Sequence, residues 1–137
     1  DLVKASNVAV VAEEVSSRID ISAEQIIRWN PEVIILNGEP KQSLSPADAV
    51  SAFESDTRYK NVAAVIKGNV YAIPKYPYSW FDRPPATNRL IGIYWLGGLI
   101  YPDLVNVDII EKAKEFYALF YHIELTENQI VELLGKI

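Results

Sequence analysis

The spacing of hydrophobic and polar residues predicts alternating helices and strands in the first half of this 137-residue chain. Ser22-Ala23-Glu24-Gln25 has the form of a capping box and predicts a short helix over 23–29. Asn30-Pro31 ends that helix, because the residue before a proline avoids helical angles. Val33 to Leu36 is a continuous apolar run, which is typical of a short strand buried on both faces of a parallel sheet.

The middle of the chain contains one further helix and two apolar runs. Ser45-Pro46 predicts an N-cap with proline at the first helical position, and the helix is expected to continue to about Phe53. Residues 62–66 and 70–73 flank a Lys-Gly-Asn segment and can be interpreted in isolation as a hairpin. The second run is the firmer strand prediction, and it leads directly into an unusual loop.

Three helices are predicted in the last part of the chain. Thr87 or Asn88 can cap a helix over about 89–100 that is apolar nearly all round, so we expect it to be buried. Asp108 begins a helix to about Tyr121, and a second capping box begins a last helix at Thr126. The residues expected to face inward in these two helices are Ile109, Ala113, Phe116, Tyr117, Phe120, Ile130, Leu133 and Leu134. The order of elements predicts an α/β layered domain with a small parallel or mixed sheet.

Composition narrows the class of protein. Half of the residues are hydrophobic, 23% are charged and the net charge is −5, so we expect one soluble globular domain and no nucleic-acid partner. The longest apolar run, Leu90 to Tyr101, is broken by Gly97-Gly98 and is shorter than the roughly 18 to 20 residues that a bilayer span needs. The chain lacks methionine, so residue 1 is not a natural translation start, and we expect a processed or excised piece.

The sequence offers little for catalysis or metal binding. The absence of cysteine excludes disulfides, thiolate zinc sites and cysteine nucleophiles, and it fits an extracytoplasmic protein. His122, the single histidine, follows a helix's last turn, where its imidazole is expected to satisfy free carbonyls as a cap, so a transition-metal site is not expected. Neither a Gly-x-Ser-x-Gly elbow nor a phosphate-binding loop occurs, and Glu13-Glu14 is more simply a solvated pair than an acid/base dyad. We therefore expect neither an enzyme nor a resident cofactor.

The segment 76–85 is the strongest functional signal. It places four aromatic rings and one guanidinium in a loop that prolines keep from being helix or strand. Flat rings beside a cation suit a large, partly apolar, anionic ligand. We expect Trp80 to face outward and contact this ligand and Arg83 to recognise an anionic group, although Arg83 could instead pair with Asp82. The rings that share the logic of Trp80, some of which must anchor the loop, are Tyr76, Tyr78 and Phe81.

Other residues have simpler explanations. Trp29 and Trp95 lie among Ile and Leu neighbours in predicted helices, so core packing is expected for both. Asn37 follows a strand's carboxyl end, where open α/β sheets bind ligands, but Asn37-Gly38 is more simply an ordinary turn. The free N–H groups at the start of the helix over 89–100 give a second reason for an anion to bind beside the loop.

Taken together, these segments resemble the C-terminal lobe of substrate-binding proteins of ABC importers for iron-siderophores, haem and cobalamin. The resemblance covers nearly the whole chain, and three matching segments in order make it specific. They comprise Asn7-Val8-Ala9 with Ile21 to Leu36, then Tyr59-Lys60-Asn61 with Ala64 to Tyr71, and finally Trp80-Phe81-Asp82-Arg83-Pro84 through Leu96 with Tyr101-Pro102-Asp103. The third matches the family's Trp-x-x-Arg-Pro loop, its following helix and its Tyr-Pro-Asp turn.

The resemblance implies a Rossmann-like three-layer lobe, with a small, mainly parallel sheet flanked by helices, over residues 1–137. It implies that the 76–83 loop lines a cleft closed by an absent N-terminal lobe and linking helix. Trp80 would pack on the ligand, Arg83 would bind its carboxylate or phosphate, and Asp82 is a candidate for docking to the permease. The protein would be periplasmic or extracellular, meeting a membrane only through the permease or an upstream lipid anchor.

Two alternatives stay open. An enzyme lobe of chelatase-like or oxidoreductase type could use the same cleft, although the loop offers only Asp82 and tyrosine hydroxyls as titratable groups. A receptor of the same class could instead bind a bare oxyanion. Such a ligand would favour backbone donors and serine, so the aromatic loop argues against it and favours an iron-siderophore, haem or cobalamin.

Overall fold

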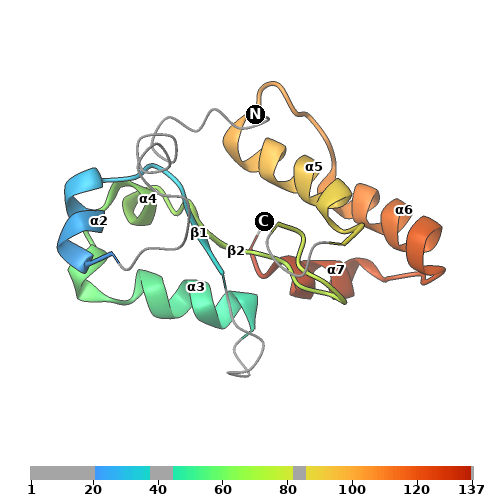
Figure 1. Cartoon of the computed structure of the whole chain (residues 1–137), viewed down its shortest axis with the longest axis horizontal. Coiled ribbons are helices and arrows are strands. Elements are labelled where there is room, and N and C mark those ends of the chain that lie inside the picture. Colours follow the sequence, from blue (N-terminus) through green and yellow to red (C-terminus); the bar gives the residue numbers. More distant parts are fainter. Residues whose placement is uncertain (1–20, 38–44, 82–85, 137) are drawn as a thin grey trace.

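The computed structural model describes residues 21–37, 45–81 and 86–136 as an α/β fold with a small parallel sheet between two groups of helices (Figure 1). This confirms the predicted fold class. The described elements are α2 (Ala23–Trp29), β1 (Ile34–Leu36), α3 (Pro46–Glu54), the 3-10 helix η2 (Thr57–Tyr59), α4 (Ala63–Ile66), β2 (Val70–Ala72), α5 (Arg89–Ile100), α6 (Ile109–Tyr121) and α7 (Glu127–Leu134). None of the helices within the described ranges is long and apolar enough to cross a membrane.

Side-chain caps fix the starts of α2, α3, α6 and α7 as predicted. The Ser22 hydroxyl accepts a hydrogen bond from the Gln25 amide at the start of α2. Complete capping boxes begin α3, through Ser45 and Asp48, and α7, through Thr126 and Gln129. Each box pairs backbone N–H groups that the first helical turn leaves without a partner.

Asn30 closes one helix and opens another. Its backbone adopts the left-handed conformation, with φ of 46°, at the C-terminus of α2. Its side-chain oxygen accepts a hydrogen bond from the amide of Ala63, at 2.8 Å, at the start of α4. The neighbouring Pro31 carbonyl accepts from Ala64 at 2.9 Å, so the end of α2 is joined directly to the start of α4.

The hairpin interpretation of residues 62–73 is wrong. Ala63–Ile66 is the helix α4, and β2 pairs in parallel with β1, with Ile34 opposite Val70 and Leu36 opposite Ala72. A parallel pair needs a crossover connection, which α3, η2 and α4 supply here. The two apolar runs resemble a hairpin only when the partner strand, more than 30 residues earlier, is left out of the comparison.

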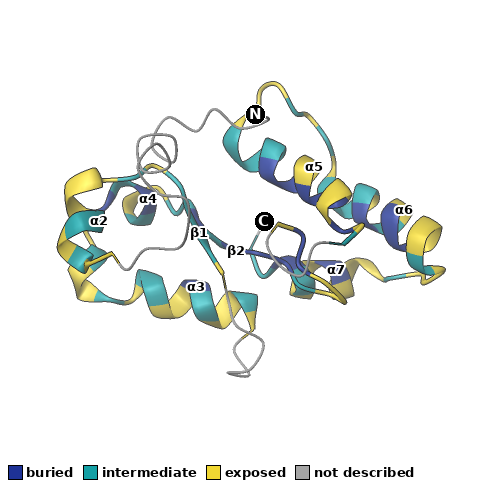
Figure 2. Ribbon diagram, viewed as in Figure 1, coloured by how far each residue is buried: buried dark blue, intermediate teal, exposed yellow. Residues whose placement is uncertain are grey.

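Alternate residues of the two strands pack into two separate clusters, one on each face of the sheet (Figure 2). The first, which we call the small-residue cluster, is formed by Val50, Val62, Ala64, Val70 and Ala72. The second, the aromatic cluster, is formed by Ile73, Trp80, Ile91, Trp95, Leu96, Ala113, Phe116, Tyr117, Ile130 and Leu134. Helix α3 also contacts α7, and Lys136 Nζ lies 2.7 Å from the Glu54 carboxylate. The helices on the two faces of the sheet are therefore joined away from the sheet as well.

Burial confirms some of the predicted core and corrects the rest. Trp95 is buried as expected, whereas Trp29 is 38% exposed, so core packing was the wrong prediction for it in the described structure. Helix α5 buries one face and exposes Leu90, Ile93 and Tyr94 on the other, so it is not enclosed all round. Phe120 in α6 is also exposed. His122 ends α6 in the left-handed conformation as a structural cap, but the group that bonds to the Tyr117 carbonyl is its backbone N–H and not the imidazole that the sequence suggested.

Candidate functional site

The carboxyl ends of the two strands meet at one edge of the sheet. Leu36 and Ala72 are in register, and the Ile73 amide donates to the Leu36 carbonyl at 2.9 Å. Asn37 continues from β1 and is exposed, and β2 continues through Pro74 into the loop that the sequence singled out. Ligands of open α/β sheets bind outside these carboxyl ends. We call Asn37 and residues 75–81 the ligand edge.

The loop at the ligand edge is a tight, hydrogen-bonded turn. Lys75 and Ser79 form an antiparallel bridge, and the Trp80 amide donates to the Pro74 carbonyl at 3.0 Å. Ser79 is buried, and its hydroxyl accepts from the Phe81 amide at 3.3 Å. The backbone of the loop therefore returns on itself, which fixes the directions in which its side chains leave.

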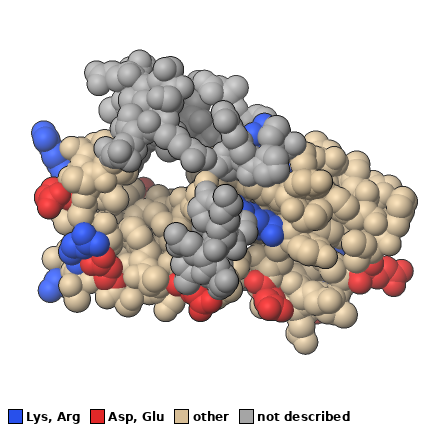
Figure 3. Space-filling model, turned by 60° about the horizontal axis from the view of Figure 1, so that its bottom comes forward, with Lys and Arg blue, Asp and Glu red and all other residues tan. Residues whose placement is uncertain are grey.

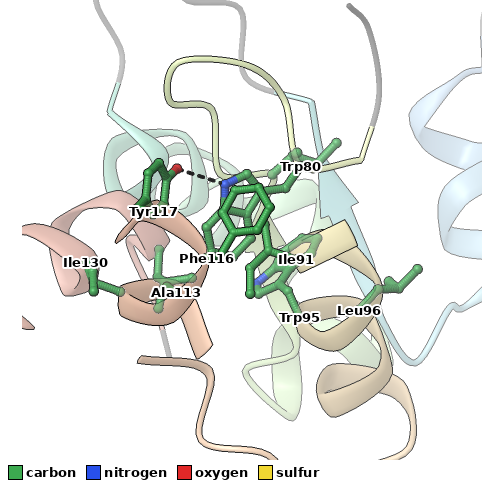
Figure 4. Close-up of a cluster of buried hydrophobic side chains, with 10 residues drawn as sticks. Trp80, Ile91, Trp95, Leu96, Ala113, Phe116, Tyr117 and Ile130 are labelled. Atoms are coloured by element: carbon green, nitrogen blue, oxygen red, sulfur yellow. Dashed lines mark hydrogen bonds between the residues drawn. The ribbon is translucent and has the colours of Figure 1, made fainter. Parts of the chain in front are cut away.

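Trp80 points inward, so the prediction that it faces outward toward a ligand is wrong. The side chain is 1% exposed and packs in the aromatic cluster, near Ile91 and Trp95 (Figure 4). Its ring nitrogen donates to the Tyr117 hydroxyl at 3.2 Å. Trp80 is thus one of the residues that anchor the loop.

Gly92 explains how the indole enters the core. A Cβ at this position would lie 1.8 Å from the Trp80 carbonyl oxygen and 2.8 Å from its carbonyl carbon. Only a residue without a side chain lets α5 approach the loop backbone this closely. The sequence showed the tryptophan and the glycine, but it gave no sign that they touch.

The other rings of the loop point outward. Tyr76, Tyr78 and Phe81 are 52%, 45% and 47% exposed, which leaves their side chains available at the ligand edge. Their role in ligand binding, like that of Asn37, stays a prediction. Asp82 and Arg83, the predicted docking and anion-binding residues, lie outside the residues that the structure describes.

A buried polar residue that sequence reasoning treated only as a possible helix cap holds the loop from inside. Asn88 is fully buried, and its side-chain nitrogen donates to the carbonyls of Tyr76, at 3.0 Å, and Tyr78, at 2.9 Å. Its side-chain oxygen accepts from the Tyr121 hydroxyl. No side-chain bond from Asn88 caps α5. The sequence did show Asn88 as a polar residue at the start of an otherwise apolar helix. Its hydrogen-bond partners, however, lie 10 to 33 residues away along the chain, so local patterns could not identify them.

Helix α6 supplies the two hydroxyls of this arrangement. Tyr117 is fully buried, donates to the Tyr76 carbonyl and accepts from Trp80. Burial raises the pKa of Tyr117 to about 12. Burial also raises the pKa of Tyr121, with a smaller contribution from the nearby Tyr78 hydroxyl. Both phenols therefore stay protonated at neutral pH, where each can donate its hydrogen bond.

Charged side chains do not gather into a basic stripe on the face of the described residues that Figure 3 shows, where blue and red atoms alternate. Surface cations also lie beside acids, as in Arg58 with Asp56 at 2.6 Å and Lys67 with Glu32 at 2.7 Å. These ion pairs lower the pKa of the Asp56 and Glu32 carboxyls, and the largest cause in each case is the hydrogen bond from the partner cation. This distribution gives little support for nucleic-acid binding on that face.

The structure also has an apolar groove of about 360 Å³ between α5 and α6, which the sequence did not predict. Leu90, Ile93 and Tyr94 line it from α5, and Leu119 and Phe120 from α6. The charged residues at its border, Lys112 and Glu115, pair with each other at 2.6 Å. The groove therefore offers contact area but few polar groups that could orient a small ligand.

Comparisons with known proteins give a consistent family. Residues 1–77 match a family model described as periplasmic binding protein. Over 114 residues the chain is 28% identical to the molybdate-binding protein MolA of Haemophilus influenzae, covering 82% of this chain and 30% of that protein.

Two solved structures are similar in both sequence and shape. An ABC transporter solute binding protein from Sulfurospirillum deleyianum is 32% identical, with a TM-score of 0.71, over 83% of this chain and 33% of that one. A periplasmic solute binding protein from Veillonella parvula is 30% identical, with a TM-score of 0.72, over 90% of this chain and 36% of that one. The chain thus spans about a third of the length of each relative.

Proposed function

Because the chain belongs to the periplasmic binding protein family, we propose that it is the C-terminal lobe of a two-lobed solute receptor for an ABC importer. Proteins of this family work with permease subunits, bind small molecules and act in the periplasm or outside the cell. The observation that carries the proposal is the ligand edge, where Asn37 and the ring-bearing loop extend from adjacent strand ends. The lobe binds its solute and does no chemistry on it.

The coverage of the relatives supports a shared site. Each relative is about three times as long as the stretch it shares with this chain, which leaves room for a second lobe to close over the ligand edge. A ligand between two lobes is enclosed far more completely than one resting on a single surface. The permease is the second partner, and Asp82 remains the proposed docking acid. A lipid anchor upstream would hold the receptor at the membrane.

The first candidate for the solute is a molybdate-like oxyanion. One relative is named for binding molybdate, and the inward position of Trp80 removes the largest ring that had favoured a bulky ligand. Tyr76 and Tyr78 are exposed residues, and a tyrosine hydroxyl is a suitable hydrogen-bond donor to an oxyanion oxygen. Arg83 would supply the compensating charge.

The second candidate is an iron chelate such as a siderophore, with haem and cobalamin in the same class. Three exposed rings in one short loop favour it, because ring faces contact apolar, planar parts of a large ligand. These two candidates need different atoms of the same residue, since an oxyanion uses the Tyr78 hydroxyl and a chelate uses the ring.

The test is calorimetric titration of the complete receptor containing this lobe with sodium molybdate and with a ferric siderophore. For an oxyanion, Tyr78→Phe and Tyr78→Ala should weaken binding by similar factors of about tenfold. For a chelate, Tyr78→Phe should bind almost as the wild type does, and Tyr78→Ala should bind several-fold more weakly. Tyr101→Ala, a tyrosine at the far end of α5, is the control and should leave affinity unchanged. Wild-type affinity in both Tyr78 variants and in Phe81→Ala would remove the loop from the site.

A further inference from the structure

One buried side chain, that of Asn88, makes three hydrogen bonds, two to the loop that carries the exposed rings and one to helix α6. Asn88 has two N–H donors and one carbonyl acceptor in its amide, and all three functions are used. The two donors engage the carbonyls of Tyr76 and Tyr78, whose rings point to solvent. The backbone of the two ring-bearing residues is thus bound from the protein side, and the rings face the ligand side.

Helix α6 fixes this arrangement from behind. Tyr117 and Tyr121 are four residues apart, so they lie on one face of the helix. Tyr121 donates to the side-chain oxygen of Asn88, and Tyr117 donates to the backbone carbonyl of Tyr76 and accepts from the Trp80 ring nitrogen. The Tyr76 carbonyl therefore receives two donors, one from Asn88 and one from Tyr117, which is the full capacity of its two lone pairs.

We propose that Asn88 is a positioning residue for ligand binding, which sets the loop conformation that directs Tyr76 and Tyr78 toward the ligand and couples it to α6 through Tyr121. This rests on the proposed function for the ligand itself, but the positioning of the loop can be measured without ligand. A loop conformation that broke these bonds would leave the buried Asn88 amide and Tyr117 hydroxyl without their loop partners, which favours the conformation observed. A loop positioned in advance binds ligand without the entropy loss of ordering it.

Asn88→Asp is the sharpest variant, because it keeps the size of the side chain and replaces the amide nitrogen, which carries both donors, with a carboxylate oxygen that repels the Tyr76 and Tyr78 carbonyls. Ile130→Val is the matched control, since Ile130 is a fully buried core residue in α7 outside this hydrogen-bonded group. Amide hydrogen exchange of residues 76–81 is followed in the ligand-free receptor. Calorimetry then measures affinity for sodium molybdate and for a ferric siderophore.

We expect Asn88→Asp to speed exchange in the loop at least tenfold, with exchange in α3 unchanged, and to weaken binding of the active probe at least tenfold. Ile130→Val should lower the melting temperature while leaving loop exchange and affinity at wild-type values. Should Asn88→Asp fail to fold, Tyr121→Phe removes one hydroxyl from the group and should speed loop exchange and weaken binding several-fold.

Two results would overturn the proposal. One is a folded Asn88 variant in which the loop amides exchange at the wild-type rate. The other is a variant with faster loop exchange but unchanged affinity for a probe whose binding Tyr78→Ala weakens. Failure of the proposed function is distinguishable, because wild-type affinity in the Tyr78 and Phe81 variants removes the loop from the site whatever Asn88 does to exchange.

Discussion

The two clusters on opposite faces of the sheet differ in what holds them together. The small-residue cluster contains Val and Ala side chains packed between the strands, α3 and α4. The aromatic cluster contains indole and phenol groups that hydrogen-bond to each other, and its Tyr117 hydroxyl joins the Asn88 amide in binding the loop backbone. Apolar packing is tolerant of shape, whereas buried polar groups require particular partners. The face that presents the candidate site is therefore the one whose core is specified by hydrogen bonds.

The largest expected effect comes from removing the indole of Trp80. Trp80→Ala should lower the free energy of unfolding by about 4 kcal/mol, because it empties a buried ring volume and leaves the Tyr117 hydroxyl with one partner fewer. Phe81→Ala, at the neighbouring exposed ring, should change it by less than about 1 kcal/mol. Urea denaturation measures both. Equal effects would mean that the loop is not anchored through the aromatic cluster.

Gly92→Ala tests the close approach between α5 and the loop. The added methyl would overlap the Trp80 carbonyl, so we expect a loss of about 3 kcal/mol. Gly98→Ala in the same helix is the matched control, because a Cβ there has its nearest neighbour at 4.0 Å. That variant should be neutral or more stable by up to about 1 kcal/mol, since alanine favours helix over glycine. Thermal unfolding of the two variants measures both changes in stability. An unchanged stability of Gly92→Ala would contradict the close approach of α5 to the loop backbone.

Val62→Ala examines the other cluster. Val62 is 1% exposed, and truncating it should cost about 2 kcal/mol of stability through lost apolar burial and a small cavity. Because this cluster does not bond to the loop, amide exchange of residues 76–81 should stay at its wild-type rate in native conditions. Faster loop exchange in this variant would remove the distinction between the two faces.

The smallest predicted effect is the pH dependence of stability that Tyr117 contributes. The pKa of Tyr117 is about 12 in the folded protein, above its ordinary value of about 10, so the native state favours the protonated phenol. The stability that this phenol contributes is fully present below pH 10 and is lost as the pH rises toward 12. By pH 11 the loss amounts to about 1 kcal/mol of the free energy of unfolding. Tyr117→Phe should show a correspondingly shallower fall between pH 9 and 11 in urea titrations. Parallel pH profiles for the two proteins would contradict this assignment.

Local signals in the sequence predicted the helices that have side-chain caps, because caps act within a few residues. The capping boxes at Ser45 and Thr126 and the stop at Asn30 were all readable in this way. The position of Trp80 was not, since it depends on Gly92 and Tyr117, which are 12 and 37 residues further along the chain.

The same limit applies to the strands and to α5. Residues 62–73 resemble a hairpin until β1 is available as the partner of β2. The apolar character of α5 indicates that it is hydrophobic on most sides, but it does not show which side another helix covers. For the candidate site, the edge and the loop were predictable from strand ends and composition, whereas the inward or outward direction of each ring required the three-dimensional structure.

The double use of Asn30 has a consequence for how this domain tolerates change. A glycine at position 30 would adopt the left-handed turn readily and preserve the end of α2, yet it could not accept the bond from Ala63. An aspartate could accept that bond, but the left-handed residue at a helix C-terminus is usually glycine and sometimes asparagine. Asparagine can both adopt the left-handed conformation and accept the bond from Ala63. A substitution at this one position would therefore disturb the end of α2 and the start of α4 together.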